Sequence, residues 1–362
     1  MKYRLATVYP EITLPAAAGT ITIPIRLEEP ISRLAMKFNV TKSLDSMTNH
    51  PAADITRIEL VDGSDVLHST TGFENQALVM FDRKTPTCLE GVFLKNVPQD
   101  SMYGIDFGRW LFDPELALVT KNFLMPQLKV TYNSLLSDTG ATIPKLAVWA
   151  YVFDEKIISP RGWLMAKEHH AEAAPALNAY KYVNLPIDFP YRRIMVRAFY
   201  EAYPPEYTIA HVKIDEDNDR RVPWSVNAED YIELSMPRWQ QVNEPLHVCL
   251  GTPETVTDFY FTASTYFNMI AGITTDNTRI VEAIRSRTGG FAQLRAPNVT
   301  TMLGATMGYC PNHCFDFECG DPKDLDDWYD VKKVGDLRMR VQGGSAGISG
   351  EYQVVIQQLR YY

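Results

Sequence analysis

The sequence lacks any apolar stretch approaching the roughly 18 residues that a membrane-spanning helix needs. Its first residues, Met1-Lys2-Tyr3-Arg4, are followed by no long apolar core and no signal-peptide cleavage pattern. We therefore expect synthesis and assembly in a cytoplasm.

A basic arm is missing as well. The 35 Lys and Arg residues are outnumbered by 44 Asp and Glu, which gives a net charge of −9 and a pI of about 5.4. Like charges form no long run, whereas neutralising the phosphates of a nucleic acid requires clustered Lys and Arg. We therefore expect no direct binding to nucleic acid.

Catalytic signatures are also absent. The chain has no serine hydrolase elbow, no Walker loop and no dinucleotide-binding fingerprint. Its five cysteines (Cys88, Cys249, Cys310, Cys314 and Cys319) are an odd number, which indicates reduced thiols and not a disulfide framework. We expect no enzyme activity, and we assign no catalytic, cofactor-binding or metal-binding residue.

The informative feature is an internal duplication, because four blocks recur in the same order in the two halves. The offset between matching residues is 162 to 154 in the first two blocks and 210 to 207 in the last two. This jump places roughly 55 extra residues in the second half, between 236 and 314. The matched segments are 23–27 with 185–189, 30–37 with 190–197, 55–60 with 209–214, 106–107 with 316–317, 128–130 with 337–339, and 146–152 with 353–359.

Most of the chain has the pattern of short strands. Apolar residues alternate with polar ones over 20–27, as in strands with one wet face. Pro24 and Pro186 fall at matching places, and because proline cannot donate to a sheet ladder, we expect edge strands or bulges there. About eight strands per half fit two sheets packed face to face, whereas the alternating βα units of an enzyme barrel are absent.

Three short helices are expected. One covers 74–81, and a second covers 164–174 in an Ala-rich bridge between the halves. In the insert, Asp276 and Thr278 precede Ile280, Val281 and Ile284 at helical spacing. The expected organisation is a first β-sandwich over 1–160, a partly helical linker over 161–180, and a second sandwich over 181–362 with an insert at about 240–310.

Three segments carry a resemblance to a known family. They are residues 58–67, the run Asp106-Phe107-Gly108-Arg109 with Asp113-Pro114-Glu115 beyond it, and the C-terminal residues 354–361. These resemble bacteriophage double jelly-roll major capsid proteins of the adenovirus–tectivirus–corticovirus lineage, nearest to the corticovirus and finnlakevirus type. The resemblance covers both halves but not the insert at 240–310.

The resemblance implies an all-β chain of two tandem eight-stranded jelly rolls. It implies a structural protein of an icosahedral virion, in which homotrimers form pseudo-hexagonal capsomers. The implied partners are the chain itself, neighbouring capsomers and penton or minor capsid proteins, and many members enclose a membrane beneath the shell. The insert would be a surface tower or an intersubunit clamp.

The densest set of candidate metal ligands is Cys310, His313, Cys314 and Cys319. The three-residue gap between Cys310 and Cys314 suits zinc. However, the matching first-half segment around Asp106 contains no cysteine. We therefore favour buried thiols over a metal site.

Two acidic segments invite a calcium hypothesis, the 215–219 turn (Asp215, Glu216, Asp217 and Asp219) and the 324–330 segment (Asp324, Asp326, Asp327 and Asp330). The first lacks the glycine and terminal glutamate of an EF-hand, and its counterpart at 62–65 suggests a hairpin turn. The second suits a wet face beside a buried Trp328. His169-His170 has no nearby nucleophile motif, so we expect an exposed helix there.

Two further function classes compete with a shell subunit. A carbohydrate- or receptor-binding jelly roll could use Trp110, Trp163 and Trp239 as a sugar platform, although tryptophan in a β-sandwich is more often core. A duplicated cupin enzyme would need histidines that recur at equivalent positions. The seven histidines, at 50, 68, 169, 170, 211, 247 and 313, do not.

Overall fold

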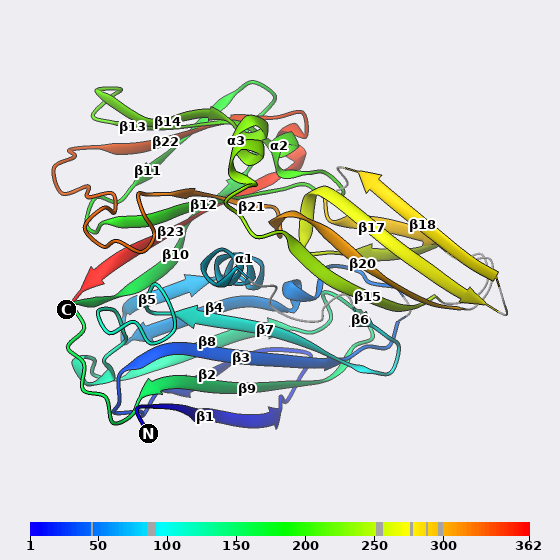
Figure 1. Ribbon diagram of the computed structural model, residues 1–362, viewed down its shortest axis with the longest axis horizontal. Coiled ribbons are helices and arrows are strands. Elements are labelled where there is room, and N and C mark those ends of the chain that lie inside the picture. The colour runs from blue at the N-terminus through cyan, green and yellow to red at the C-terminus, as the bar shows by residue number, and fades with distance from the viewer. Residues whose placement is uncertain (45, 85–91, 251–255, 276–277, 287–288, 296–299) are drawn as a thin grey trace.

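The computed structural model describes residues 1–44, 46–84, 92–250, 256–275, 278–286, 289–295 and 300–362. Strands dominate, in two stacks of sheets with the helix α1 (Gly72–Arg83) between them (Figure 1). A third group of strands projects from one end of the molecule, and both chain termini lie at the opposite end (Figure 1). Two β-sandwiches and one added β-structure therefore make up the described chain.

The first sandwich consists of two antiparallel four-stranded layers, ordered β1-β9-β3-β7 and β2-β8-β4-β5. Strict alternation builds them: every second side chain of β8 is buried, and these side chains meet those of β3 and β9 in one core. The strands are β1 (Tyr3–Thr13), β2 (Ala18–Pro24), β3 (Ile31–Thr41), β4 (Ile55–Asp62), β5 (Asp65–Thr70), β7 (Pro98–Asp106), β8 (Pro126–Asn133) and β9 (Thr142–Phe153).

The second sandwich repeats this plan with layers β10-β23-β12-β21 and β11-β22-β13-β14. A parallel bridge between Ser69 of β5 and Lys167 of β10 joins its first layer to the first sandwich, so eight strands form one continuous sheet. The strands are β10 (Gly162–Ala173), β11 (Tyr180–Leu185), β12 (Tyr191–Phe199), β13 (Ile209–Glu216), β14 (Arg221–Asn227), β21 (Cys314–Glu318), β22 (Leu337–Gly343) and β23 (Glu351–Tyr361).

The predicted duplication is confirmed by the topology. When the eight sandwich strands of each half are numbered in chain order, both halves pair them 1-8-3-6 and 2-7-4-5. This order is the jelly roll. Helical turns recur as well: η1 (Pro51–Asp54) and α1 in the first half match α2 (Pro205–Thr208) and α3 (Ala228–Ser235) in the second. Two further 3-10 turns lie one in each half of the chain: η2 (Thr120–Asn122) precedes β8, and η3 (Gly347–Ser349) precedes β23.

The ladders refine the predicted alignment. Arg33 on β3 and Arg193 on β12 are equivalent, at the predicted offset of 160. Asp106 pairs with Arg33, and Glu318 pairs with Arg193, so the true offset of these sixth strands is 318 − 106 = 212 and not 210. The predicted match of Asp106 with Asp316 is therefore two residues out, a slip that keeps side chains on the same face. The predicted match of 146–152 with 353–359 is one residue out, because Tyr151 lies opposite Arg33 and Gln357 opposite Arg193, an offset of 357 − 151 = 206.

The predicted insert is confirmed as β-structure between α3 and β21. Its main sheet has the order β18-β17-β20-β15-β6, and β16 pairs with β19. The short strand β6 comes from the first half and runs parallel to β15, so both halves contribute to this sheet. The strands are β6 (Val92–Phe93), β15 (Val242–Leu250), β16 (Val256–Tyr260), β17 (Ala263–Thr275), β18 (Thr278–Ser286), β19 (Phe291–Arg295) and β20 (Thr300–Pro311).

Two of the three predicted helices are wrong. The 164–174 segment is strand β10, which pairs with β23 along its whole length, and the segment containing Ile280, Val281 and Ile284 is strand β18. Ala-rich and Ile/Val-rich segments are ambiguous locally, and pairing with a neighbouring strand decides their structure. Asp276 lies outside the described residues.

The remaining local predictions are confirmed. The predicted helix at 74–81 is α1, whose Thr71–Glu74 capping box sets its start and whose left-handed Lys84 ends it. Pro24 ends β2 and Pro186 follows β11, and both strands are sheet edges. The longest helix in the described part of the chain, α1, has only 12 residues, and no helix there meets the length and hydropathy of a membrane span.

Equivalent core positions should make equivalent contributions to stability. Leu60 and Ile214 are fully buried, each in the core of its own jelly roll. We expect Leu60→Ala and Ile214→Ala each to lower the free energy of unfolding by about 2–5 kcal/mol, measured by urea denaturation, because each leaves a cavity. Leu124→Ala, at a fully exposed side chain, is the control and should change it by less than about 0.5 kcal/mol. Equal effects at all three positions would contradict these core assignments.

Candidate functional site

The junction between the two jelly rolls combines an apolar cluster with a network of buried ion pairs. Helix α1 belongs to the first jelly roll, yet it also lies on the outer face of the second (Figure 1). Its Ala77, Leu78 and Phe81 provide the apolar part of the contact. They pack against one residue from each strand of the β10-β23-β12-β21 layer, namely Ala166, Met195, Cys314 and Val355.

Beside this apolar cluster, Asp82 of α1 holds two arginines of β12. Its carboxylate accepts a hydrogen bond from Nη1 of Arg192 and lies 3.3 Å from Nη2 of Arg193. Gln357 of β23 donates to Asp82 at 3.1 Å and accepts from Arg192 at 3.0 Å. Burial acts to raise the pKa of Asp82, but the two guanidinium groups outweigh it, so the net shift is downward. Asp82 is therefore a buried, charged anchor between the rolls.

Arg193 is the most buried arginine of this network. Its Nη1 lies 2.7 Å from Asp316 Oδ2, yet neither atom makes a hydrogen bond of good geometry, so the contact is ionic. Glu318 lies farther away, at 3.8 Å. Burial raises the pKa of Asp316 to about 6, although the charge of Arg193 opposes the shift. Such a pair depends on both partners, because a buried charge left alone is costly.

Farther along β12, Arg197 joins the start of α1 to the second roll. Its guanidinium lies 4.5 Å from the ring centre of Phe73 and 4.6 Å from that of Phe199, which are cation–π contacts. The same side chain donates to Gln353 at 3.0 Å and pairs with Glu351 at 3.1 Å. The junction thus buries three arginines of one strand, each with an acidic or aromatic partner.

Glu74 is the unusual acid of the junction. Its Oε2 accepts from the backbone N–H of Thr71 at 2.7 Å, while its Oε1 has no hydrogen-bond partner among the described residues. Burial raises the pKa of Glu74 to about 8, and the neighbouring Glu168 carboxylate adds to the shift. Glu168 is itself paired with Arg57 at 3.1 Å. Burial and the Glu168 carboxylate therefore both favour the protonated form of Glu74.

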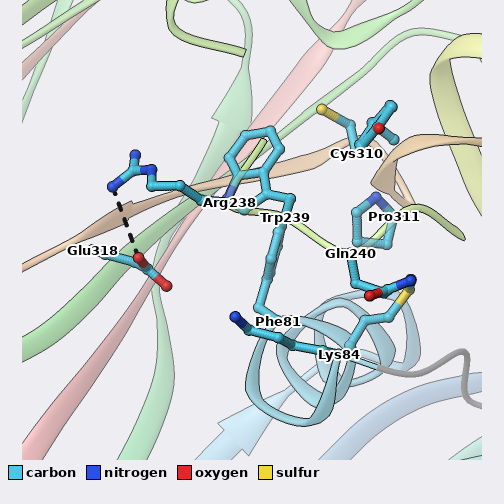
Figure 2. Close-up of a pocket in the computed structure, with 10 residues that line it drawn as sticks. Phe81, Lys84, Arg238, Trp239, Gln240, Cys310, Pro311 and Glu318 are labelled. Carbon is cyan, nitrogen blue, oxygen red and sulfur yellow. Dashed lines mark ion pairs between the residues drawn. The ribbon is translucent and has the colours of Figure 1, made fainter. Parts of the chain in front are cut away.

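A small cavity lies where α1, the segment after α3 and β20 meet (Figure 2). Phe81 and Trp239 face each other across it at 5.6 Å between ring centres, and Arg238 pairs with Glu318 at 3.9 Å on one side. The cavity volume is about 10 Å³, room for no more than a single water. It is a packing seam and offers no space for a substrate.

Buried thiols, which the sequence favoured over a metal site, are confirmed for three of the candidate ligands. Cys310 and Cys319 are free thiols in the core of the second jelly roll, Cys314 is a free thiol in the apolar cluster under α1, and burial raises the pKa of each. His313 packs edge-on against Phe199, and burial lowers its pKa to about 3. No group of three or more metal-ligating side chains occurs in the described part of the chain. Cys88 and the side chain of Cys249 lie outside the described residues.

Three carboxylates of the 215–219 segment are already paired with nearby residues of the same chain. Asp215 pairs with Arg338 at 3.0 Å and Asp219 with Lys213 at 2.6 Å. Asp217 accepts hydrogen bonds from the backbone N–H groups of residues 335 and 336. The segment is the β13–β14 turn, as predicted, and its carboxylates stabilise loop structure.

The second acidic segment also consists of turns. Asp327 accepts from the backbone N–H of Asp321, and the buried Trp328 indole donates to the Asp321 carbonyl at 3.1 Å. Asp324 accepts from the N–H of Asp326, and Asp330 accepts from that of Lys332. These carboxylates therefore serve as local turn caps.

The predicted exposed helix at His169-His170 is wrong, because both residues lie on strand β10. His169 contacts the carbonyl of Asn184, and His170 contacts Glu172. The three tryptophans do not form one platform either: Trp163 is buried in the first core, Trp239 packs on Phe81, and Trp110 is half exposed on a loop.

The sequence did not predict the junction. A usable signal existed, since Arg33 and Arg193 were aligned as equivalent arginines, each on a strand that otherwise presents apolar side chains to a core. The partner Asp82 lies 110 residues from Arg192, however, and no local pattern connects the two.

The raised pKa of Glu74 predicts a pH-dependent stability. Its contribution is fully present below the ordinary value of 4.5 and is lost as the pH rises through about 8, because the folded junction disfavours the charged form. Glu74→Gln stays neutral, so its melting temperature should exceed that of the wild type at pH 8–9 and equal it near pH 4.5. Glu28→Gln, at a highly exposed surface position, is the control. A constant difference across this pH range would refute the assignment.

Arg193 and its equivalent Arg33 should differ in their effect on stability. Arg193→Met leaves Asp316 buried without its partner, and we expect a loss of about 3–5 kcal/mol in the free energy of unfolding. Arg33→Met should cost less, because Asp106 keeps Arg83 at 2.8 Å and the site is partly solvated. Urea denaturation of both variants measures the two losses. A larger loss in the free energy of unfolding for Arg33→Met than for Arg193→Met would contradict the importance given to the buried junction.

Comparisons with known proteins agree with this topology. No family model and no curated protein matches the chain. Among solved structures, the major capsid protein of Sulfolobus turreted icosahedral virus has a TM-score of 0.60 at 10% identity, covering 100% of this chain and 98% of its own. The PBCV-1 protein VP54 has a TM-score of 0.59 at 9% identity, covering 99% of this chain and 93% of its own. The chain therefore has the double jelly-roll fold of the major capsid proteins to which it is similar.

Proposed function

We propose that this chain is the major capsid protein of an icosahedral virus and assembles as a homotrimer. The observation that carries the proposal is the duplication itself. Two jelly rolls of identical strand order lie in one chain, joined by a buried and specific junction. Three such chains around a threefold axis present six similar units, which is the outline that packs into a hexagonal shell. The full-length fold similarity to a virion shell protein supports this reading.

The proposal places the protein in the virion, after synthesis in a host cytoplasm. Its principal partner is itself, first within the trimer and then between neighbouring capsomers. Penton and minor capsid proteins are further partners, as is a membrane beneath the shell in the manner of many members of the lineage. The net charge of −9 is consistent with a coat that does not contact the genome directly. The projecting β15–β20 structure would form a tower on the capsomer.

A carbohydrate- or receptor-binding role for the whole chain has less support. Its platform would need exposed aromatic side chains on one surface, whereas Trp163 is buried and Trp239 is packed in the seam. No observation favours the duplicated-cupin alternative. Self-assembly accounts for the duplication without a ligand.

The proposal is tested by the mass of the purified protein in solution. Size-exclusion chromatography with light scattering should give about 123 kDa, which is three times 41.1 kDa. The species should persist on dilution, because shell subunits associate through large interfaces. A monodisperse 41 kDa monomer at high concentration would contradict the proposal. Cryo-electron microscopy of a particle containing this chain would then place the trimer in its lattice.

A further inference from the structure

We infer that α3 of one chain packs on the outer β1-β9-β3-β7 face of a second copy, repeating between chains the contact that α1 makes within the chain. This inference rests on the proposed trimer and names the surfaces that form it. The evidence is a set of equivalent positions that are buried in the second jelly roll and uncovered in the first.

The eight residues of α3 are equivalent to residues 72–79 of α1. Asn75 of α1 donates to the Gly104 carbonyl at 2.9 Å, and Tyr231 of α3 donates to the Asp316 carbonyl at 2.8 Å. Gly104 and Asp316 occupy the same ladder position, opposite Ala35 and Met195 respectively. The helix offset is therefore 231 − 75 = 156, and the N-cap residues Thr71 and Asn227 differ by the same number.

Leu78 and Leu234 are consequently equivalent, because each lies seven residues after its N-cap. Leu78 is 5% exposed, since it is packed in the apolar cluster of the junction. Leu234 is 75% exposed. A large aliphatic side chain at the buried position of a repeated helix, left in water, indicates a missing partner.

The two sheet faces are equivalent as well. The four apolar residues that α1 covers are Ala166, Met195, Cys314 and Val355, and the ladders assign them the first-roll counterparts Leu5, Ala35, Met102 and Trp149. In the second roll these residues are buried, and β12 is buried on both faces. In the first roll Leu5 is 54% exposed and the other three are half-buried.

Charge at the helix start fits the same arrangement. Within the chain, Glu74 of α1 lies near Arg197 and Glu168 of the second roll. The helix offset makes Asp230 the counterpart of Glu74, and the ladders make Lys37 and Thr7 the counterparts of Arg197 and Glu168. Asp230 would therefore meet Lys37 at a position where Thr7 replaces the carboxylate of Glu168, and it would join the ion pair that Lys37 already makes with Glu11 at 2.6 Å.

An open space exists beside this face for the incoming helix. A cleft of about 350 Å³ lies next to Arg33, with Arg83, Asp106 and Trp110 among its lining residues. The corresponding arginine of the second roll, Arg193, is instead covered by Asp82 of α1. Asp82 also lines the cleft, and Arg33 and Arg83 both pair with Asp106, so the cleft supplies space for the helix and no unpaired positive charge among these residues.

The partner is a second copy of this chain, because the covering element is α3 itself. Within a chain, the helix of the first roll covers the second roll. In the inferred contact between chains, the helix of the second roll covers the first roll of the next copy. Given three copies, every outer face of this kind is then covered, and the ring closes without an open edge.

The decisive test is charge exchange across the inferred contact. Lys37→Glu and Asp230→Lys should each shift the protein from trimer towards monomer in light-scattering chromatography. The double variant, K37E with D230K, should recover trimer, because the pair is restored with reversed sign. Leu234→Asp should abolish the trimer, whereas Leu124→Asp, at a 99% exposed leucine outside the contact, should leave it intact.

A cross-link provides a second readout that does not depend on stability. Leu234→Cys combined with Ala35→Cys should give disulfide-linked oligomers on a non-reducing gel, and Leu234→Cys with Leu124→Cys should not. If the wild type is trimeric but L234D remains trimeric and no cross-link forms, the contact is overturned while the proposed function stands. If the wild type itself never exceeds the mass of a monomer, the proposed function fails first.

Discussion

The layer β10-β23-β12-β21 is buried on both faces. The arrangement of the two jelly rolls depends on the contact that covers its outer face. One face closes the core of the second jelly roll. The other carries three arginines of β12, which cannot be covered by an apolar surface alone. Helix α1 covers it with an apolar stripe ending in Asp82. An apolar contact alone would tolerate sliding, whereas a buried guanidinium group requires its carboxylate at one position.

The relative placement of the two jelly rolls follows from this constraint. The sheets themselves are joined by one parallel bridge, between Ser69 and Lys167, and a single bridge does not fix an angle. The strand β6 adds a second link by pairing with β15 of the insert. Between these two links lies α1, which is anchored to its own roll by Asn75 and to the other by Asp82. Ion pairs of Arg57 with Glu168 and of Arg360 with Asp65 also join the two rolls, so several separate contacts fix their relative placement.

The sequence predicted a duplicated β-sandwich because matching segments of the two halves alternate apolar and polar residues in the same way, and the resemblance to a known family specified the jelly roll. Segments such as 55–60 and 209–214 place apolar side chains on one face in both halves, and an acidic turn follows each, over 62–65 in the first half and 216–221 in the second. The helix at 164–174 failed because alanine is compatible with both structures, and only the partner strand β23 decided between them. The junction between the two rolls could not be predicted for a related reason. Its charges are distant in sequence, and Arg192 or Asp82 alone has the pattern of a surface residue.

The two copies of the fold have diverged where their surroundings differ. At the ladder position that faces the start of the helix, the second roll has Glu168 where the first roll has Thr7. At the centre of the face, the second roll has Val355 where the first roll has Trp149. The second roll meets α1 of its own chain, whose geometry is fixed by covalent connection. A contact between separate chains must also pay the translational and rotational entropy of association. Larger apolar side chains favour such a contact, and the first roll has Leu5 for Ala166, Met102 for Cys314 and Trp149 for Val355, while only Ala35 is smaller than its counterpart Met195.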